Sequence, residues 1–253
     1  MFSKSTVKYI QSLQHKKFRD EEGVFVAEGP KVVAELISGN VFVCVNLYAL
    51  KEWADSLTVA LKEAMQEKLT IIKDFELEKI SALSKPNQVI GIFTKKKQIV
   101  APDLKNKITI LLDDIQDPGN LGTIIRIADW FGIENVICSP HTADMYNSKV
   151  VQSTMASLQR VNLIYTELEQ FLSSHPNIRK LAATLNGTPV YAVAGLSEAI
   201  LIIGNESKGI SPPVLLMTDG KVTIPKRGNA ESLNAGVAAG IILHEIFREA
   251  AMS

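Results

Sequence analysis

Three stretches after residue 107 combine polar side chains with glycines in ways that could hold a ligand. The first, DDIQDPGNLGTIIRIADWFGI, follows an apolar run and enters a helical pattern. Asn120 stands where the N-cap of that helix would be, and two neighbouring glycines allow a partner to approach closely. Arg126 has an isoleucine on each side, so its guanidinium should lie at the edge of a buried surface and need an anion. An ordinary ion pair explains the same pattern, with Asp113, Asp114 or Asp129 as the acid.

The second stretch, LIIGNESKGIS, covers residues 201–211 and begins as an apolar strand. The strand leads into Gly204, Asn205 and Glu206, and Gly209 ends a tight loop. Because the glycines remove bulk around it, the Glu206 carboxylate is well placed to touch a ligand. Taken alone, the pattern is equally typical of a left-handed turn that binds nothing.

The third stretch, IPKRGNAESLNAGVAAGIILHEIF, covers residues 224–247. A proline and a glycine interrupt the chain, and Ser232, Leu233 and Asn234 then open a helix rich in alanine and glycine. Small residues allow a neighbouring segment, a ligand or another subunit to approach the backbone. The alternative interpretation is that Ser232 and Asn234 only cap the helix.

The elements that must position these stretches alternate between strands and helices along the chain. The first hundred residues form one α/β pattern, and a polar, proline-containing segment, KKKQIVAPDLKNK, follows as a linker. The alternation restarts with the predicted strands ITILLDD, NVICSP, VNLIYT, KLAATL, ILIIGNE and KVTIP. Helices are expected at TIIRIADWFG, KVVQSTMASLQ and LEQFLSSH, and from about Ala230 to Ala251. This alternation predicts a parallel sheet covered on both faces, with ligands at the carboxyl ends of its strands.

Composition narrows the functional classes. No run of residues is apolar enough to span a membrane and the polar N-terminus is not a signal peptide, so a cytoplasmic protein is expected. Cys44 and Cys138 lie in apolar contexts and should be reduced core residues, with a disulfide or a metal role as the alternative. The four histidines have no metal-ligand spacing, so no metal is expected. Neither G-x-G-x-x-G nor G-x-x-x-x-G-K-[ST] occurs, which disfavours a Rossmann oxidoreductase and a P-loop protein.

Charge is balanced overall but unevenly distributed. The formal net charge is zero, which argues against a general polyanion binder. Residues 1–19 nevertheless carry basic side chains without an acid, and Lys95, Lys96 and Lys97 form a second cluster. From charge alone, these patches are as consistent with solvated lysines as with a nucleic-acid surface.

Together and in this order, the three stretches resemble the signature motifs of the SpoU family of RNA ribose methyltransferases, within the SPOUT superfamily. The first motif corresponds to DPGNLG through Arg126 and FGI, the second to GNE with Gly209, and the third to IP, Gly228 and SLN. The resemblance covers roughly Lys105 to the C-terminus. Through GVFVAEGPKVVAEL, the N-terminal unit resembles the substrate-binding domain often fused to this family, which is similar to small ribosomal RNA-binding proteins.

The resemblance implies an S-adenosylmethionine-dependent enzyme that methylates a ribose 2′-hydroxyl in structured RNA, with ribosomal RNA favoured over transfer RNA. It implies an α/β fold with an RNA substrate-binding domain over residues 1–97, a linker over 98–107 and a SpoU methyltransferase domain over 108–253. The latter should hold a parallel sheet and a deep trefoil knot. It further implies a homodimer that completes the active site across its interface.

Carried over by position, the resemblance implies a catalytic set of Asn120, Arg126, Glu206, Ser232 and Asn234. It implies cofactor contacts, largely through backbone groups, at Thr184, Leu185, Gly204, Asn205, Ile224 and Leu233. A guanidinium stays protonated in proteins, so Arg126 is expected to bind RNA phosphate and stabilise a developing alkoxide rather than act as the base.

Two related functions stay open at this point. One is a transfer-RNA ribose methyltransferase, and the other is a non-catalytic RNA-binding protein of the same fold. The intact catalytic set argues against the second, because a lapsed enzyme would be expected to lose some of these residues.

Overall fold

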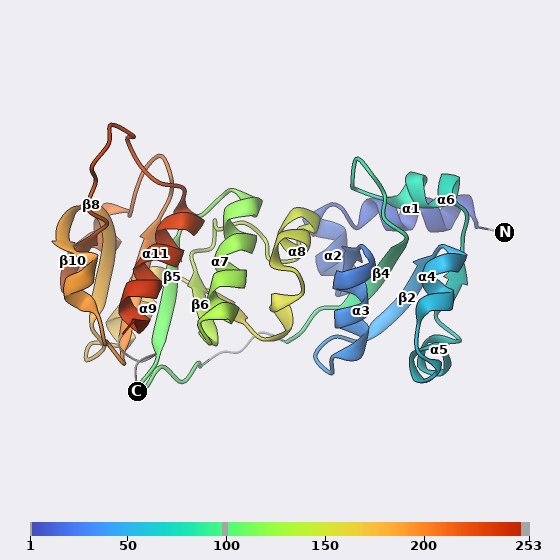
Figure 1. Cartoon of the computed structure of the whole chain (residues 1–253), viewed down its shortest axis with the longest axis horizontal. Helices are drawn as coiled ribbons and strands as arrows, with labels where there is room; N and C mark the ends of the chain where they lie inside the picture. The colour runs from blue at the N-terminus through green and yellow to red at the C-terminus, as the bar shows by residue number, and fades with distance from the viewer. Residues whose placement is uncertain (1, 98–100, 249–253) are drawn as a thin grey trace. The chain divides into compact units, whose positions relative to one another are not determined.

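The structure, a computed structural model, describes residues 2–97 and 101–248, and the chain divides into two compact units (Figure 1). The first unit contains the described residues up to Lys97 together with Asp144–Gln159. The second contains the described residues up to Ala143 and those from Arg160 onward. The expected linker, 98–107, includes three residues outside the described ranges. The sequence predicts one continuous domain over residues 108–253. In the structure, the segment Asp144–Gln159 instead groups with the first unit by its contacts.

The first unit is built on a four-stranded mixed sheet in the order β1-β4-β2-β3. β4 pairs antiparallel with β1 and with β2, whereas β2 and β3 run parallel. The strands are β1 (Val24–Glu28), β2 (Cys44–Ala49), β3 (Leu69–Ile71) and β4 (Val89–Thr94). The helices are α1 (Lys4–Ser12), α2 (Lys16–Glu22), α3 (Pro30–Ser38), α4 (Lys51–Ser56), α5 (Val59–Met65), α6 (Asp74–Ile80) and α8 (Ser148–Thr154). The expected α/β character of this region is confirmed.

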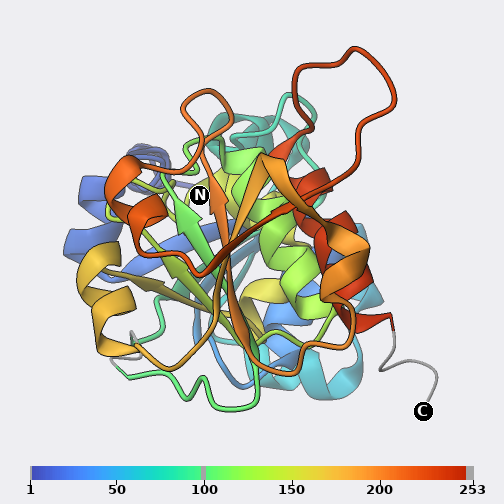
Figure 2. The same ribbon diagram turned by 90° about the vertical axis from the view of Figure 1, so that its left-hand side faces the viewer.

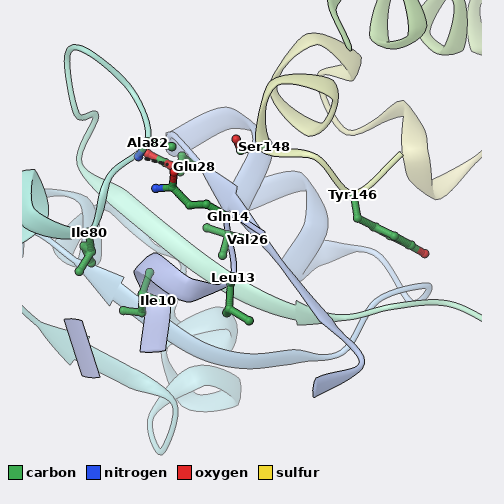
Figure 3. A pocket seen from close by; sticks show the side chains of 9 residues that line it. All are labelled: Ile10, Leu13, Gln14, Val26, Glu28, Ile80, Ala82, Tyr146 and Ser148. Carbon is green, nitrogen blue, oxygen red and sulfur yellow. Dashed lines mark hydrogen bonds between the residues drawn. The ribbon is translucent and has the colours of Figure 1, made fainter. Parts of the chain in front are cut away.

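A small hollow lies in the first unit, between the end of α1, β1 and the segment that precedes α8 (Figure 3). Apolar side chains, including Ile10 and Val26, line it together with the Glu28 carboxylate. That carboxylate is satisfied, because it accepts hydrogen bonds from Ser81 Oγ at 2.6 Å and the Ala82 amide at 2.8 Å. The hollow has room for about one water molecule, so it is too small for a nucleotide base.

The second unit is built on a six-stranded sheet in the order β10-β8-β9-β5-β6-β7, in which every pair is parallel. The strands are β5 (Ile108–Asp113), β6 (Asn135–Cys138), β7 (Asn162–Tyr165), β8 (Lys180–Pro189), β9 (Ala199–Gly204) and β10 (Gly220–Thr223). Every residue of β5 is buried, as expected of a central strand with both faces covered. The predicted parallel α/β sheet is confirmed.

Helices cover both faces of this sheet (Figure 2). α7 (Pro118–Trp130) and α11 (Ala235–Phe247) pack together on one face, and α9 (Leu168–Ser174) and α10 (Pro212–Leu216) lie on the other. A short 3-10 helix, η2 (Val190–Val193), also contacts α11.

Three predicted elements need correction. The terminal helix begins at Ala235 rather than near Ala230, because Asn234 caps it; its predicted end at Ala251 lies outside the described residues. The helix expected over KVVQSTMASLQ stops at Thr154, because Met155 and Ala156 take left-handed backbone angles, and a 3-10 turn (Ser157–Gln159) follows. The strand KLAATL does not end at its last leucine, because β8 continues to Pro189.

Both cysteines are free and buried. Burial raises the pKa of the Cys44 thiol to about 11, and it also raises the pKa of Cys138. Both thiols therefore stay protonated and poorly nucleophilic at neutral pH, as expected of core residues. Within the part of the chain that the structure describes, no helix is long and apolar enough to cross a membrane.

Candidate active site

The three polar stretches meet at the carboxyl edge of the second sheet. β5 and β9 are neighbours in register, so their last residues, Asp113 and Gly204, lie opposite each other. α7 begins after β5, the loop of residues 204–209 follows β9, and the segment leading to α11 follows β10. Because parallel strands all end at one edge, segments far apart in sequence come together here.

A hydrogen-bonded chain joins one side chain from each stretch. Asn234 Nδ2 donates to Asn120 Oδ1 at 2.6 Å, and Asn120 Nδ2 donates to the Glu206 carboxylate. The order of donors is fixed by chemistry, since an ionised carboxylate only accepts; Asn120 must therefore present its NH₂ to Glu206 and its oxygen to Asn234. Asn120 is buried, at 8% exposed, whereas Glu206 lies on the surface. These hydrogen bonds thus fix the exposed Glu206 carboxylate through the buried Asn120 side chain.

Asn120 is not the N-cap of α7, contrary to the sequence prediction. Asp117 has that role, because its Oδ1 accepts a hydrogen bond from the Asn120 amide at 2.8 Å. Pro118 takes the first helical position, which places Asn120 in the first turn. Because Asp117 accepts the hydrogen bond from the backbone amide at the start of the helix, the Asn120 side chain is free to bind Glu206 and Asn234.

Asn234 does cap its helix, and it also reaches across to α7. Its Oδ1 accepts from the Gly236 amide at 3.0 Å and the Val237 amide at 3.2 Å, while its Nδ2 serves Asn120. The Asn234 side chain therefore caps α11 through its oxygen and binds Asn120 through its NH₂ group, so the capping interpretation and the functional one both hold. Ser232 and Leu233, just before it, are exposed.

Small residues on α11 let it lie close against α7. A Cβ built at Gly236 would stand 2.8 Å from Thr123 Cγ2, which is closer than side-chain carbons pack. At the far end of the pair, the rings of Phe131 and Phe247 stack with centroids 5.5 Å apart. The segment that approaches these small residues is therefore α7, and this contact brings Asn234 within reach of Asn120.

The loop that carries Glu206 is held by its own asparagine. The backbones of Asn205 and Gly209 exchange hydrogen bonds of 3.0 and 2.9 Å. The Asn205 side chain donates to the Asp114 carbonyl at 2.8 Å and accepts from the Ser207 and Lys208 amides. A Cβ at Gly204 would lie 2.3–2.5 Å from the backbone of residues 209 and 210, so only glycine fits there.

Arg126 is exposed and has no ion pair among residues 2–97 and 101–248. The three aspartates proposed as partners are engaged elsewhere. Asp113 accepts from the Ser211 amide at 2.7 Å, Asp129 pairs with Arg160 at 2.8 Å, and Asp114 faces Lys208 Nζ at 4.0 Å. The ordinary ion-pair interpretation of Arg126 is therefore not what the structure contains.

The remaining candidate cofactor residues gather where β8 and β10 pair. Leu185 is 70% exposed, and its carbonyl accepts from Thr223 Oγ1 at 3.0 Å, one residue before the half-buried Ile224. Thr184 Oγ1 donates to the carbonyl of Asn186 at 2.7 Å. A Cβ at Gly187 would lie 2.6 Å from the Lys221 carbonyl oxygen, so β8 approaches its parallel neighbour β10 closely there, where the register of the pair shifts. This close approach was missed in the sequence, although its Asn-Gly dipeptide is a known turn signal.

No group of three or more histidine, cysteine, aspartate or glutamate side chains that could hold a metal occurs among the described residues. The polar groups that the three stretches bring together here are instead the amides of Asn120 and Asn234 and the Glu206 carboxylate, and Leu185 and Leu233 are exposed on neighbouring segments. Such a set can orient a polar substrate and an apolar-faced ligand.

Comparison with known proteins assigns the family. The model of the SpoU rRNA Methylase family matches residues 107–244, and that of the MRM3-like substrate binding domain matches residues 4–91. The chain therefore belongs to the SpoU rRNA methylase family and carries a substrate-binding domain ahead of it. Both resemblances expected from the sequence are confirmed.

Individual relatives cover nearly the whole chain. The 23S rRNA (guanosine(2553)-2′-O)-methyltransferase RlmP of Bacillus subtilis is 28% identical, with 95% of each chain covered. A protein of the TrmH family from Porphyromonas gingivalis is 32% identical, with a TM-score of 0.85 over 98% of this chain and 99% of that one. The AdoMet-bound rRNA methyltransferase of Sinorhizobium meliloti is 27% identical, with a TM-score of 0.85 over 98% and 96%.

Proposed function

We propose that this protein transfers a methyl group from S-adenosylmethionine to a ribose 2′-hydroxyl of ribosomal RNA. The observation that carries the proposal is the chain from Asn234 through Asn120 to the exposed Glu206, assembled from all three motifs. Arg126 adds a guanidinium that no acid in the described part of the chain neutralises. Relatives named as rRNA 2′-O-methyltransferases support ribosomal rather than transfer RNA as the substrate.

The residues at and after the ends of β8, β9 and β10 fit S-adenosylmethionine. Gly204 and Gly187 leave backbone groups where any side chain would collide, and Leu185 and Leu233 offer exposed apolar surface beside them. We assign the cofactor to this region, with contacts at Thr184, Leu185, Gly204, Asn205, Ile224 and Leu233. When bound, the cofactor supplies a sulfonium methyl group that needs no metal for activation. We also propose that the segments after β8, β9 and β10 form the trefoil knot that the family resemblance implies.

Each catalytic side chain has a distinct part in this mechanism. Asn120 and Asn234 hold Glu206 in one orientation, so the carboxylate can accept a hydrogen bond from the target nucleotide. Arg126 binds the adjacent phosphate and stabilises the negative charge that develops on the ribose oxygen. Ser232, which is exposed two residues before the N-cap Asn234, donates a hydrogen bond to the substrate. Water accepts the hydroxyl proton, since a guanidinium is too weak an acid to be found deprotonated.

The protein works as a homodimer in this proposal. α7 and α11, which pack together, expose the large apolar side chains of Trp130 at 85%, Val237 at 49% and Ile241 at 36%, and Leu233, just before α11, is 46% exposed. Exposed apolar surface of this kind is typical of a protein interface. Arg126 lies on the same helix as Trp130, one turn earlier, so a second copy on this face would border the active site. Val237→Glu with Ile241→Glu should convert the dimer to monomer in light scattering; an unchanged mass would contradict this interface.

The first unit holds the RNA in this scheme, by shape and backbone rather than by sequence. We place the reaction in the cytoplasm, where ribosomal RNA is modified in bacteria such as the source of RlmP.

Calorimetric titration and methyl transfer test the proposed function directly. The protein should bind S-adenosylmethionine and not NAD, and it should transfer labelled methyl to unmodified 23S rRNA. Mapping ribose methylation in a deletion strain then identifies the nucleotide. Methylation of tRNA alone would identify transfer RNA as the substrate. Binding of RNA without binding of S-adenosylmethionine would support a non-catalytic role. Binding of neither S-adenosylmethionine nor RNA would contradict the proposal.

A further inference from the structure

The segment between β10 and α11 forms an exposed loop at the active-site edge. Every residue from 225 to 234 is exposed, and the dark red loop projects from the rest of the second unit in two views (Figures 1 and 2). Both ends are fixed, by the Thr223 bond to the Leu185 carbonyl and by the Asn234 cap on α11. Lys226 Nζ braces the loop internally by donating to the Ala230 carbonyl at 2.9 Å. The loop is therefore exposed but held in place.

The arginines of the second unit are unequally engaged. Of its five arginines, Arg160 pairs with Asp129 and Arg248 with Glu245, both at 2.8 Å. The other three have no acidic partner within the described ranges: Arg126, Arg179 and Arg227. Arg179 directly precedes β8 and so lies at the amino edge of the sheet. Arg126 and Arg227 lie on segments that leave its carboxyl edge, where Glu206, Asn120 and Asn234 meet.

We propose that Arg227 binds a backbone phosphate of the RNA strand that carries the target ribose. The inference rests on the proposed function and adds a second anchoring point to it. Each ribose in an RNA strand lies between two phosphates, and Arg126, in the third turn of α7, can bind only one of them. A guanidinium suits phosphate because its donors form a planar fork that binds two oxygens at once. Because the net charge of the protein is zero, binding must depend on local cations such as this one.

Neighbouring residues agree with this assignment. Lys226 is committed to the Ala230 carbonyl, so it positions the loop rather than the RNA. Glu231 is the one acid between residues 225 and 234, and no bond joins it to Arg227 in the described structure. Arg227 is thus the side chain of the loop that is left to meet an anion.

Arg227→Gln tests the inference, with unmodified 23S rRNA transcript as the probe. Affinity should fall about fivefold to tenfold near physiological salt, and the slope of log Kd against log salt should decrease by about 1. The single-turnover rate at saturating RNA should fall much less than the affinity, and S-adenosylmethionine binding by calorimetry should be unaltered. Arg227→Lys should restore the salt slope but only part of the affinity, since lysine cannot bind in a fork.

Arg179→Gln is the matched control, because it removes an exposed, unpaired arginine from the same unit at the opposite edge. It should leave both RNA affinity and salt slope as in the wild type. An unchanged slope for Arg227→Gln, or a loss equal to that of Arg179→Gln, overturns the inference while wild-type methylation still supports the proposed function. A wild-type protein that binds rRNA without methylating it removes the proposed function; the salt slope then still decides whether Arg227 contacts phosphate.

Discussion

Arg19 of the first unit and Arg126 of the second carry the same group in opposite surroundings. Arg19 is 2% exposed and donates to the carbonyls of Leu13 and Gln14 and to Asp144, the last at 2.6 Å. Arg126 is exposed and has none of these partners in the described chain. A buried guanidinium paired with an acid fixes the fold around it, whereas an exposed one on the surface of a helix is available to a substrate. The difference predicts that one substitution costs stability and the other costs rate.

Arg19→Leu should produce the largest loss of stability, about 3–5 kcal/mol, because it leaves a mostly buried Asp144 without its cation. Unfolding in urea, followed by the fluorescence of the buried Trp53 in a Trp130→Phe background, reports on the first unit alone. Asp144→Asn in the same background is the control for loss of charge with the shape retained. A transition midpoint close to that of the parent would mean that the ion pair is not structural.

Arg126→Ala should lower the single-turnover rate by about 100-fold to 1,000-fold, the range for removing one donor to a developing oxyanion, equal to about 2.7–4 kcal/mol. Its stability should change by less than about 0.5 kcal/mol, since the side chain is exposed and unpaired. Arg126→Lys should recover part of the rate and keep the pH profile of the wild type. If Arg126→Lys and Arg126→Ala both react at the wild-type rate across the pH range, Arg126 has no part in the chemistry.

Asn120→Ala should reduce the rate by about 10-fold to 100-fold, because Glu206 and Asn234 each lose a hydrogen-bond partner, at about 1–3 kcal/mol. The helix itself should persist, since Asp117 still caps it. Asp117→Ala is the matched comparison, with a loss of cap stability of about 1 kcal/mol and a smaller effect on rate. Equal rate losses in the two variants would show that Asn120 acts only through helix stability.

Gly236→Ala should have the smallest effect, a destabilisation of about 1 kcal/mol. The added methyl group meets Thr123 Cγ2, and the better helix propensity of alanine offsets part of that clash. Thr123→Ser removes the opposing methyl group, so the double variant should regain part of the lost stability, while the Thr123 Cβ contact at 3.1 Å remains. Failure of this rescue would mean that the contact between α7 and α11 is not what limits the packing here.

Much of the second sheet could be predicted from the sequence, because its strands are short apolar runs bounded by turn residues. The apolar run before Asp113 and the one before Gly204 became the central pair β5 and β9. Alternation of this kind reports burial on both faces, which is a local property of the sequence. The three polar stretches were found for the same reason, since each directly follows a strand.

The features that could not be predicted depend either on competition between neighbouring residues for one role or on partners that are distant in the sequence. Asp117 and Asn120 are both good capping residues, and the choice between them is settled by Pro118 at the first helical position. Met155 and Ala156 take left-handed angles that neither residue type favours, so local propensity gave no warning that α8 ends there. The partners of Asp113, Asp114 and Asp129 lie in other segments, so only the fold could show that Arg126 is left unpaired.

Asn234 has a consequence for how activity should respond to temperature. The amide that starts α11 also steadies Glu206 through Asn120, so fraying of one helix end is transmitted to the reacting groups without any loss of the core. Warming should therefore loosen Glu206, the proposed catalytic carboxylate, before the domain melts, and methyl transfer should decline some degrees below the unfolding transition. An interaction that stabilises the first turn of α11 would therefore extend the temperature range over which the enzyme is active.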